Sequence, residues 1–142
     1  MERFSISSPG KKIFPVLYLL LSVGRITSEK GGIMIVVSDA SSKTGTEIIS
    51  ALLKAGERVR GIDNSRERLA ALRSSGMEPA VGEVTDPVFL LSTFRDAESV
   101  FFIVPSRPET ESVKKYFEDT GSAFIKALRD SKVRYVYFMS SL

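Results

Sequence analysis

Residues 33–45 read Ile-Met-Ile-Val-Val-Ser-Asp-Ala-Ser-Ser-Lys-Thr-Gly, and this stretch decides the fold. Its apolar half predicts a strand at 33–38 that is buried on both faces, as strands of parallel sheets are. A segment with apolar residues at helical spacing follows, and a second apolar run ends at Asp63. Strand, turn, helix and strand in this order outline the βαβ unit whose first turn holds the pyrophosphate of a dinucleotide.

The rest of the chain continues the same alternation of apolar runs and helical patterns. Five strands alternating with four helices predict an α/β fold, a Rossmann-type doubly wound parallel sheet with strand order 3-2-1-4-5. The site then lies where the winding direction reverses, at the carboxyl ends of the first and fourth strands. The expected strands are 33–38, 58–63, 79–84, 99–104 and 133–139, and the expected helices begin near residues 44, 65, 87 and 109.

The N-terminal segment differs from the rest of the chain in charge. Five basic and two acidic side chains lie in residues 1–33, so the net charge of +3 belongs to this segment and the remainder is neutral. Two lysines precede about eleven mostly apolar residues, a length typical of a signal-peptide core and short of the roughly 20 that span a membrane. Met34 is an alternative start. We expect residues 1–32 to be a leader or extension and residues 33–142 to be one domain.

The location of the protein follows from the same segment. With no stable membrane span, we expect a cytoplasmic protein, or a targeted or secreted one if residues 1–32 act as a leader.

The side-chain inventory excludes several classes of site. The chain contains neither cysteine nor histidine. Disulfides, thiolate nucleophiles, the commonest metal ligand and the commonest general base are therefore absent, and we expect no metal site. Because the charge of the domain is balanced, we expect no nucleic-acid surface.

Two other nucleotide-linked folds fail on particular residues. Lys43-Thr44 resembles the end of the G-x-x-x-x-G-K-[ST] loop of ATPases, but Val37 and Ser42 occupy its glycine positions. A flavodoxin-like receiver domain needs an acid pair after the first strand, an aspartate after the third and a lysine after the fifth. Asp39 alone does not meet that pattern.

Four segments carry a family resemblance: 38–45, 81–86, 100–105 and 136–142. From residue 34 onward the chain resembles the NmrA-like group of atypical short-chain dehydrogenase/reductases, which bind NAD(P). The resemblance implies reduction of a small carbonyl or quinone. It also implies that the chain is truncated after the fifth strand, where the family continues with a substrate-binding part.

The family's turn reads G-x-x-G-x-x-G, and its three positions are Asp39, Ser42 and Gly45 here. Gly45 keeps the role of close packing between helix and sheet. Asp39 places a negative charge beside the pyrophosphate, against only about half a positive charge at the helix N-terminus. Ser42 crowds the phosphates but offers a hydroxyl donor. Lys43 either offsets the acid or is a solvated lysine at the helix start.

The resemblance implies further cofactor contacts at the ends of the later strands. Asp63, about 20 residues past the turn, would receive the ribose hydroxyls, and an acid there favours NAD over NADP because it repels a 2′-phosphate. Its competing role is to help cap the next helix. The candidate cofactor-binding residues are Ser38, Asp39, Ser41, Ser42, Lys43, Thr44, Gly45, Asp63, Asn64, Glu83, Val104 and Pro105.

The catalytic residues remain unknown at this stage. None of the four tyrosines is followed four residues later by lysine, so the superfamily's Tyr-x-x-x-Lys pair is absent. Ser140 is a candidate by position alone, after the fifth strand. Two functions stay open: an NAD(P)-dependent oxidoreductase, and a non-catalytic redox-sensing or degenerate module with impaired cofactor binding. An apolar flank beside the fifth strand predicts self-association.

Overall fold

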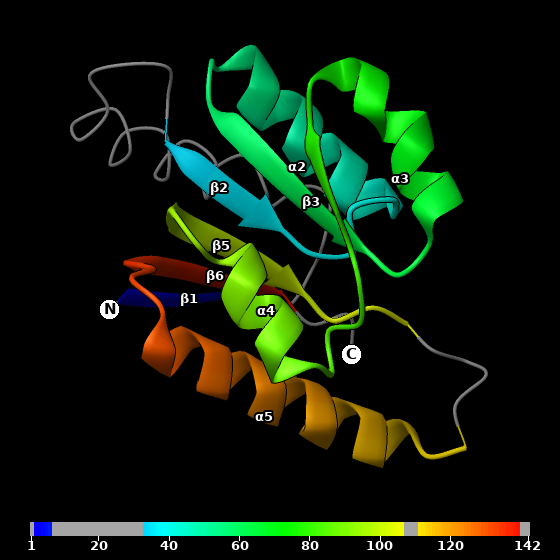
Figure 1. Cartoon of the computed structure of the whole chain (residues 1–142), viewed down its shortest axis with the longest axis vertical. Helices are drawn as coiled ribbons and strands as arrows, with labels where there is room; N and C mark the ends of the chain where they lie inside the picture. Colours follow the sequence, from blue (N-terminus) through cyan, green and yellow to red (C-terminus); the bar gives the residue numbers. More distant parts are fainter. Residues whose placement is uncertain (1, 7–32, 107–110, 140–142) are drawn as a thin grey trace.

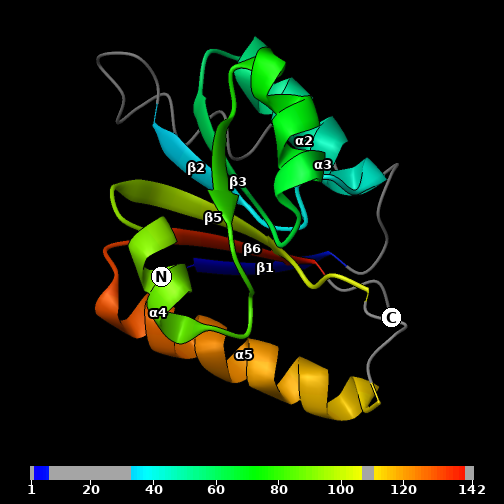
Figure 2. The ribbon, with the colours of Figure 1, turned by 45° about the vertical axis from the view of Figure 1, so that its right-hand side comes forward.

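The computed structural model describes residues 2–6, 33–106 and 111–139. In this part of the chain a parallel sheet separates two pairs of helices (Figures 1 and 2). One face carries α2 (Lys43–Lys54) and α3 (Arg66–Leu72), and the other carries α4 (Pro87–Thr93) and α5 (Val113–Asp130). The strands are β1 (Glu2–Ile6), β2 (Met34–Val37), β3 (Arg58–Asp63), β4 (Glu78–Val81), β5 (Ala97–Ile103) and β6 (Tyr135–Met139).

The strand order places the topological switch between β2 and β5. The sheet runs β1-β6-β5-β2-β3-β4, and all of its ladders are parallel. The five expected strands correspond to β2 to β6, so the predicted order 3-2-1-4-5 is confirmed. Because the chain winds outward in both directions from β2, the loops after β2 and β5 part from each other and leave a crevice.

The sheet has one strand more than expected. Glu2–Ile6 forms β1, which pairs in parallel with β6 from Tyr135 to Met139. We expected residues 1–32 to be a leader or extension outside the domain. Residues 2–6 instead form a strand of the sheet. The physical reason is that β6 would otherwise expose an edge of unpaired N–H and C=O groups, which a further strand satisfies. β1 also occupies the flank on which the predicted self-association depended.

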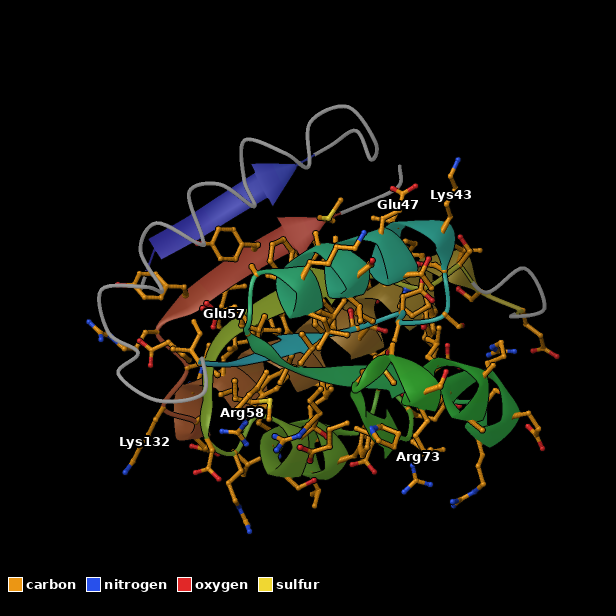
Figure 3. The ribbon with its side chains drawn as sticks, turned by 90° about the horizontal axis from the view of Figure 1, so that it is seen from above. Lys43, Glu47, Glu57, Arg58, Arg73 and Lys132 are labelled. Carbon is orange, nitrogen blue, oxygen red and sulfur yellow. The ribbon has the colours of Figure 1, made fainter. Side chains whose placement is uncertain are left out.

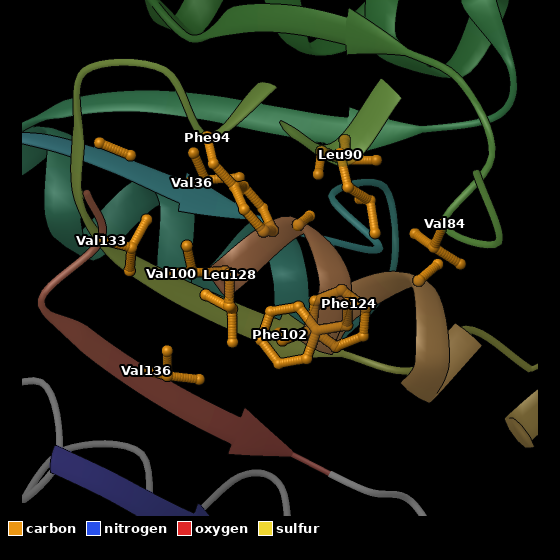
Figure 4. Packing of buried hydrophobic residues seen from close by; sticks show 14 of the residues in the cluster. Val36, Val84, Leu90, Phe94, Val100, Phe102, Phe124, Leu128, Val133 and Val136 are labelled. Carbon is orange, nitrogen blue, oxygen red and sulfur yellow. The ribbon is translucent and has the colours of Figure 1, made fainter. Parts of the chain in front are cut away.

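The core consists of two layers, one on each face of the sheet. Ile35 and Val37 of β2 pack with α2 and α3, whereas Met34 and Val36 pack with α4 and α5, and each is 3% exposed or less. Figure 4 shows the second layer, in which the rings of Phe102 and Phe124 stack with centroids 3.9 Å apart. Full burial of such side chains stabilises the fold by about 1.5–3 kcal/mol each.

Capping residues set where the helices begin. Ser42, Ser65 and Asp86 cap α2, α3 and α4, close to the expected starts. The fourth helix begins at Val113 rather than near 109, because the Ser112 hydroxyl accepts a hydrogen bond from the Lys115 N–H at 3.2 Å and defines the first turn there.

The third predicted strand is shorter than expected. β4 ends at Val81, not at residue 84, because its partner β3 ends at Asp63, and the bond from the Gly82 N–H to the Asp63 carbonyl at 3.0 Å is the last of the ladder. Glu83 consequently lies in a turn after the strand. Within the described ranges, no helix combines the length and the apolar character that crossing a membrane requires.

Candidate functional site

A cleft of about 800 Å³ lies at the carboxyl ends of β2, β3 and β4 and reaches the loop after β5. That volume is within the range of small-molecule sites. The sequence-predicted residues on its wall are Asp39, Ser41, Ser42, Asp63, Asn64, Glu83 and Pro105. The other lining residues are Ile62, Ser65, Arg66, Glu67, Arg68, Val81, Gly82, Val84 and Ser106.

Five candidates do not line the cleft. Ser38, Gly45 and Val104 are buried in the fold. Lys43 is exposed and extends from the start of α2 away from the body of the domain (Figure 3), and its neighbour Thr44 also lies outside the lining. For Lys43 the structure therefore agrees with a solvated lysine. Ser140, the candidate catalytic residue, falls outside the described residues.

The turn before α2 has a residue with positive φ at the first of the two positions where the sequence lacks a glycine of the family's turn. Asp39 has a φ of 49°, in the left-handed region that favours glycine and that aspartate tolerates better than most residues. The Asp39 carbonyl accepts hydrogen bonds from the Ser42 N–H at 3.1 Å and from the Ser42 hydroxyl at 2.8 Å. Since a hydroxyl has one proton, the Ser42 hydroxyl donates it to the backbone in this conformation.

Gly45 is required by packing. A Cβ at this position would lie 2.2 Å from the Asp39 carbonyl oxygen and 3.0 Å from the Ala40 Cα. The Gly45 N–H donates to the Ser42 hydroxyl at 2.9 Å, which caps the helix. The turn is also tied to β3, because the Ala40 N–H donates to the Ile62 carbonyl at 2.9 Å. The turn and α2 are therefore held close to the sheet.

Asp63 is a cleft side chain that accepts hydrogen bonds from three groups. Its carboxylate is 4% exposed and accepts hydrogen bonds from the Ser41 hydroxyl, the Ser65 N–H at 2.9 Å and Arg68 Nη2 at 2.8 Å. Burial alone would raise the pKa of Asp63, but these donors and the Arg68 charge outweigh it and hold the pKa below its ordinary 3.8. Asp63 is therefore ionised at neutral pH, with its charge compensated.

A second row of contacts links α3 to the turn after β4. Arg68 Nη2 donates to Asn64 Oδ1 at 2.7 Å, and Asn64 Nδ2 donates to Glu83 Oε1 at 3.2 Å. Sequence reasoning missed Arg68 and its neighbour Arg66. The available signal was the short connection between β3 and α3: two residues separate the strand from the helix, so the first helical turn lies over the strand end.

A buried serine joins the two strands that border the switch point. Ser38, directly after β2, is fully buried, and its hydroxyl donates to the Ile103 carbonyl at 2.6 Å and accepts from the Ile103 N–H at 2.6 Å. The role of Ser38 in the structure is therefore to pair with the end of β5.

The site has the chemistry of a nucleotide pocket rather than of a metal centre. Hydroxyl, amide, carboxylate and guanidinium groups meet beside a helix N-terminus, and this set suits a ribose and a phosphate. In the residues that the structure describes, no cluster of acidic side chains has the arrangement of a metal site.

Comparisons with known proteins agree with the fold. Triphenylmethane reductase from Citrobacter sp., solved with NADP(H), has a TM-score of 0.63 at 20% identity over 75% of this chain and 36% of that one. Vestitone reductase from alfalfa (Medicago sativa L.) gives 0.57 at 22% over 73% and 35%. The NADPH-dependent quinone oxidoreductase from Escherichia coli, solved with NADPH, gives 0.57 at 20% over 74% and 36%. The chain thus spans about a third of the length of these proteins.

Comparison at the level of sequence identifies the family. A search of the curated proteins found no significant match. The sequence profile of a family described as NAD(P)H-binding matches residues 40–142, which is more than half of the chain. The chain therefore belongs to the NAD(P)H-binding family.

Proposed function

We propose that this chain is the cofactor-binding domain of an NmrA-like NAD(P)-dependent oxidoreductase that reduces small carbonyls or quinones. The observation that carries the proposal is a cleft of about 800 Å³ at the carboxyl ends of β2 and β3, beside the N-terminus of α2 and lined by Asp63. A quinone oxidoreductase and a triphenylmethane reductase among the structural neighbours support a reductase reaction.

In this proposal each end of the cleft holds a different part of the dinucleotide. Asp63 receives the adenosine ribose, and Glu83 lies on the adenine side. The turn from Asp39 to Gly45 holds the pyrophosphate, and Pro105 borders the nicotinamide side. The bound dinucleotide supplies the hydride, while the protein supplies position and exclusion of water.

The residues of the cleft suit the adenosine ribose better than they suit the pyrophosphate. At the ribose end the carboxylate of Asp63 is ionised and held in place by three donors. At the phosphate end the Asp39 carboxylate opposes an anion, and the Ser42 hydroxyl is engaged with the backbone. Binding is therefore expected, with an affinity below that of a turn with three glycines.

A second candidate function is a non-catalytic module that binds or senses a dinucleotide without turnover. Two observations favour it: the Tyr-x-x-x-Lys pair is absent from the sequence, and Asp39 lies at the position of the first glycine. The two candidates share a cofactor and differ in chemistry.

Titration of the full chain with NADH and NADPH, followed by nicotinamide fluorescence, tests the shared part. We expect binding by the unmodified chain and, in Asp63→Ala, a loss of roughly tenfold or more, because a hydrogen bond to a charged group is worth about 1.5–3 kcal/mol. Asp130→Ala removes an exposed acid at the end of α5 and is the matched control. Absence of binding by the unmodified chain would overturn the proposal.

Turnover with quinones and aldehydes then tests the non-catalytic candidate. We expect little or no oxidation of NADH or NADPH by this chain, because it lacks the acid-base pair. A robust rate that Asp63→Ala reduces would exclude the non-catalytic module.

A further inference from the structure

β6 is a strand whose sequence favours pairing on both of its sides. It reads Tyr-Val-Tyr-Phe-Met and contains neither a charged residue nor a proline. On one side it pairs in parallel with β5, and on the other side it pairs in parallel with β1. An uncharged edge strand rich in aromatic and β-branched residues is a template for pairing with another chain. Without β1, the described part of the sheet would therefore end in such a template.

The opposite edge of the sheet carries its own protection. It is formed by β4, in which Pro79 has no N–H to donate and Glu78 adds a charge. Glu78 is also bound by Arg60 of β3, whose Nε lies 2.9 Å from Glu78 Oε1. Since β6 has neither an acid nor a proline, it is the strand of these two that depends on a covering strand.

β1 supplies this cover and is joined to the described fold mainly through β6. It has five residues, and its extensive contact is with β6. In the sequence, residues 7–33 lie between β1 and β2, so the pairing of β1 closes a long loop at an entropic cost. Glu2 and Arg3 bring charges to the new outer strand, and a short charged strand discourages further pairing. β1 is therefore both separable from the sheet and a poor template.

We propose that the edge of β6 is an interaction surface for a second copy of this chain, and that β1 covers this surface within its own chain. When β1 leaves, two β6 strands pair in antiparallel orientation about a two-fold axis at Tyr137. This pairing sets Val136 opposite Phe138 and Tyr135 opposite Met139 of the second copy. Pairs of aromatic and β-branched residues stabilise such a ladder. Because the two strands are identical and uncharged, the surface is complementary to itself.

This surface is separate from the nucleotide cleft. The lining of the cleft contains no residue of β1 or β6. The two strands, blue and red in Figures 1 and 3, lie on the far side of the sheet from α3. The inference therefore goes beyond the proposed function and does not depend on it, since a chain that binds no dinucleotide would test it equally well.

The first experiment removes the pairing of β1 in the full chain. Adjacent residues of a strand direct their N–H groups to opposite sides, so Phe4→Pro with Ser5→Pro removes a donor to β6 whichever residue faces it. Phe4→Thr with Ser5→Thr is the matched control, because it changes the same positions and keeps both donors. In sedimentation velocity at micromolar concentration, we expect one chain for the unmodified protein and the control, and a dimer for the proline variant.

A chain that lacks residues 1–6 should behave like the proline variant. If both remain monomeric, the inference is overturned. A dimer of the threonine control would overturn it as well, because the pairing of β1 would then not decide the oligomeric state.

A lysine on β6 then locates the contact between the copies. In the proline background, Tyr135→Lys puts a charge on the uncovered strand, and we expect it to restore the monomer. Ile125→Lys is the control, because Ile125 is an apolar residue of α5 that is 52% exposed and distant in sequence from the edge. It should leave the dimer intact. Any other pattern would place the contact outside β6 and overturn the inference.

A reversible lock tests the same idea without proline. The chain has no cysteine of its own, and Glu2 and Tyr135 are register partners in the β1–β6 ladder. Glu2→Cys with Tyr135→Cys can therefore form a disulfide that holds β1 in place. In low urea, where the separable edge strand detaches first, we expect a dimer of the reduced form and a monomer of the oxidised form. Dimers of both forms, or of neither, would contradict the role of β1.

Discussion

The two ends of the cleft differ in how well their side chains suit a ligand. At the proposed phosphate end, Asp39 has a φ of 49°, as a glycine-rich turn allows, but the side chains from Asp39 to Gly45 do not favour an anion. At the ribose end, side chains from β3 and α3 converge on Asp63 and satisfy it. The comparison teaches that in this chain the contacts within the fold are satisfied at both ends, whereas the side chains suited to a ligand are unequally distributed.

The largest expected effect tests whether the turn from Asp39 to Gly45 depends on close packing at Gly45. Gly45→Ala brings a Cβ to 2.2 Å from the Asp39 carbonyl, so the turn must move, and we expect a loss of about 3 kcal/mol in unfolding free energy. Urea denaturation measures it. The control is Gly121→Ala in α5, where an added Cβ meets nothing within 4 Å and where alanine should stabilise by about 1 kcal/mol. Equal stability of the two variants would break the comparison.

The next effect tests the ribose end. Asp63→Asn removes an ionised acceptor of three hydrogen bonds, and we expect about 2 kcal/mol of destabilisation at pH 7. Because the folded pKa is depressed below 3.8, the advantage of aspartate is complete above that value and disappears as pH falls through the folded pKa. Urea midpoints of both proteins from pH 7 to pH 2 measure this.

An exposed acid is the control for that series. Asp119 in α5 pairs with Lys115 at 2.8 Å, and both side chains are largely solvated. Asp119→Asn should change stability much less, since exposed pairs contribute little. A pH dependence of Asp63→Asn that matches that of Asp119→Asn would show that the contacts of Asp63 do not stabilise the fold.

A smaller effect distinguishes the charge of the Asp39 carboxylate from the backbone conformation of Asp39. Asp39→Asn and Asp39→Gly both tolerate a φ of 49° and both remove the carboxylate. We expect each to tighten the dinucleotide by up to about fivefold, as removing an adverse charge from a helix N-terminus does. Asp96→Asn is the control, because Asp96 also has a positive φ, the second such non-glycine residue in the described part of the chain, and lies outside this cleft. If only Asp39→Gly tightened dinucleotide binding, the effect would be due to the backbone and not to the charge.

The smallest effect concerns Lys43. Its side chain leaves the start of α2 away from the domain and does not line the cleft. Lys43→Ala should therefore change the dinucleotide Kd by less than about twofold, the range of a solvated charge. A loss beyond fivefold in the same fluorescence titration would show that the ammonium reaches the phosphate, and the phosphate end would then have a favourable group.

The sequence was most informative where one physical signal governs the structure. The apolar run before Asp39 predicts a doubly buried strand, and Asp86-Pro87 combines a capping acid with the residue best suited to the first helical position. β1 shows the opposite case. Phe4 and Ile6 alternate with polar residues, a pattern of strands, but the adjacent basic and apolar segment favoured a leader. Pairing with β6 is a tertiary property that no local pattern determines.

The site could be predicted to the level of its backbone. The position of the turn and of the acid at the end of β3 followed from the spacing of residues, and the packing role of Gly45 followed from the resemblance to the family. The contacts of Arg68 did not, because they depend on how α3 lies over the strand end. The hydroxyl of Ser42 is similar: its proton has several acceptors within reach, and the three-dimensional structure selects the Asp39 carbonyl.

Ser38 has a consequence for how the crevice holds its width. Main-chain pairing between β2 and β5 ends with the Ser38 N–H on the Phe101 carbonyl, and the serine hydroxyl then extends the ladder by one further step, to Ile103. The ends of β2 and β5 are thus joined through one side-chain oxygen, and the exchange of the Ile103 amide proton with solvent would report on local opening of this junction.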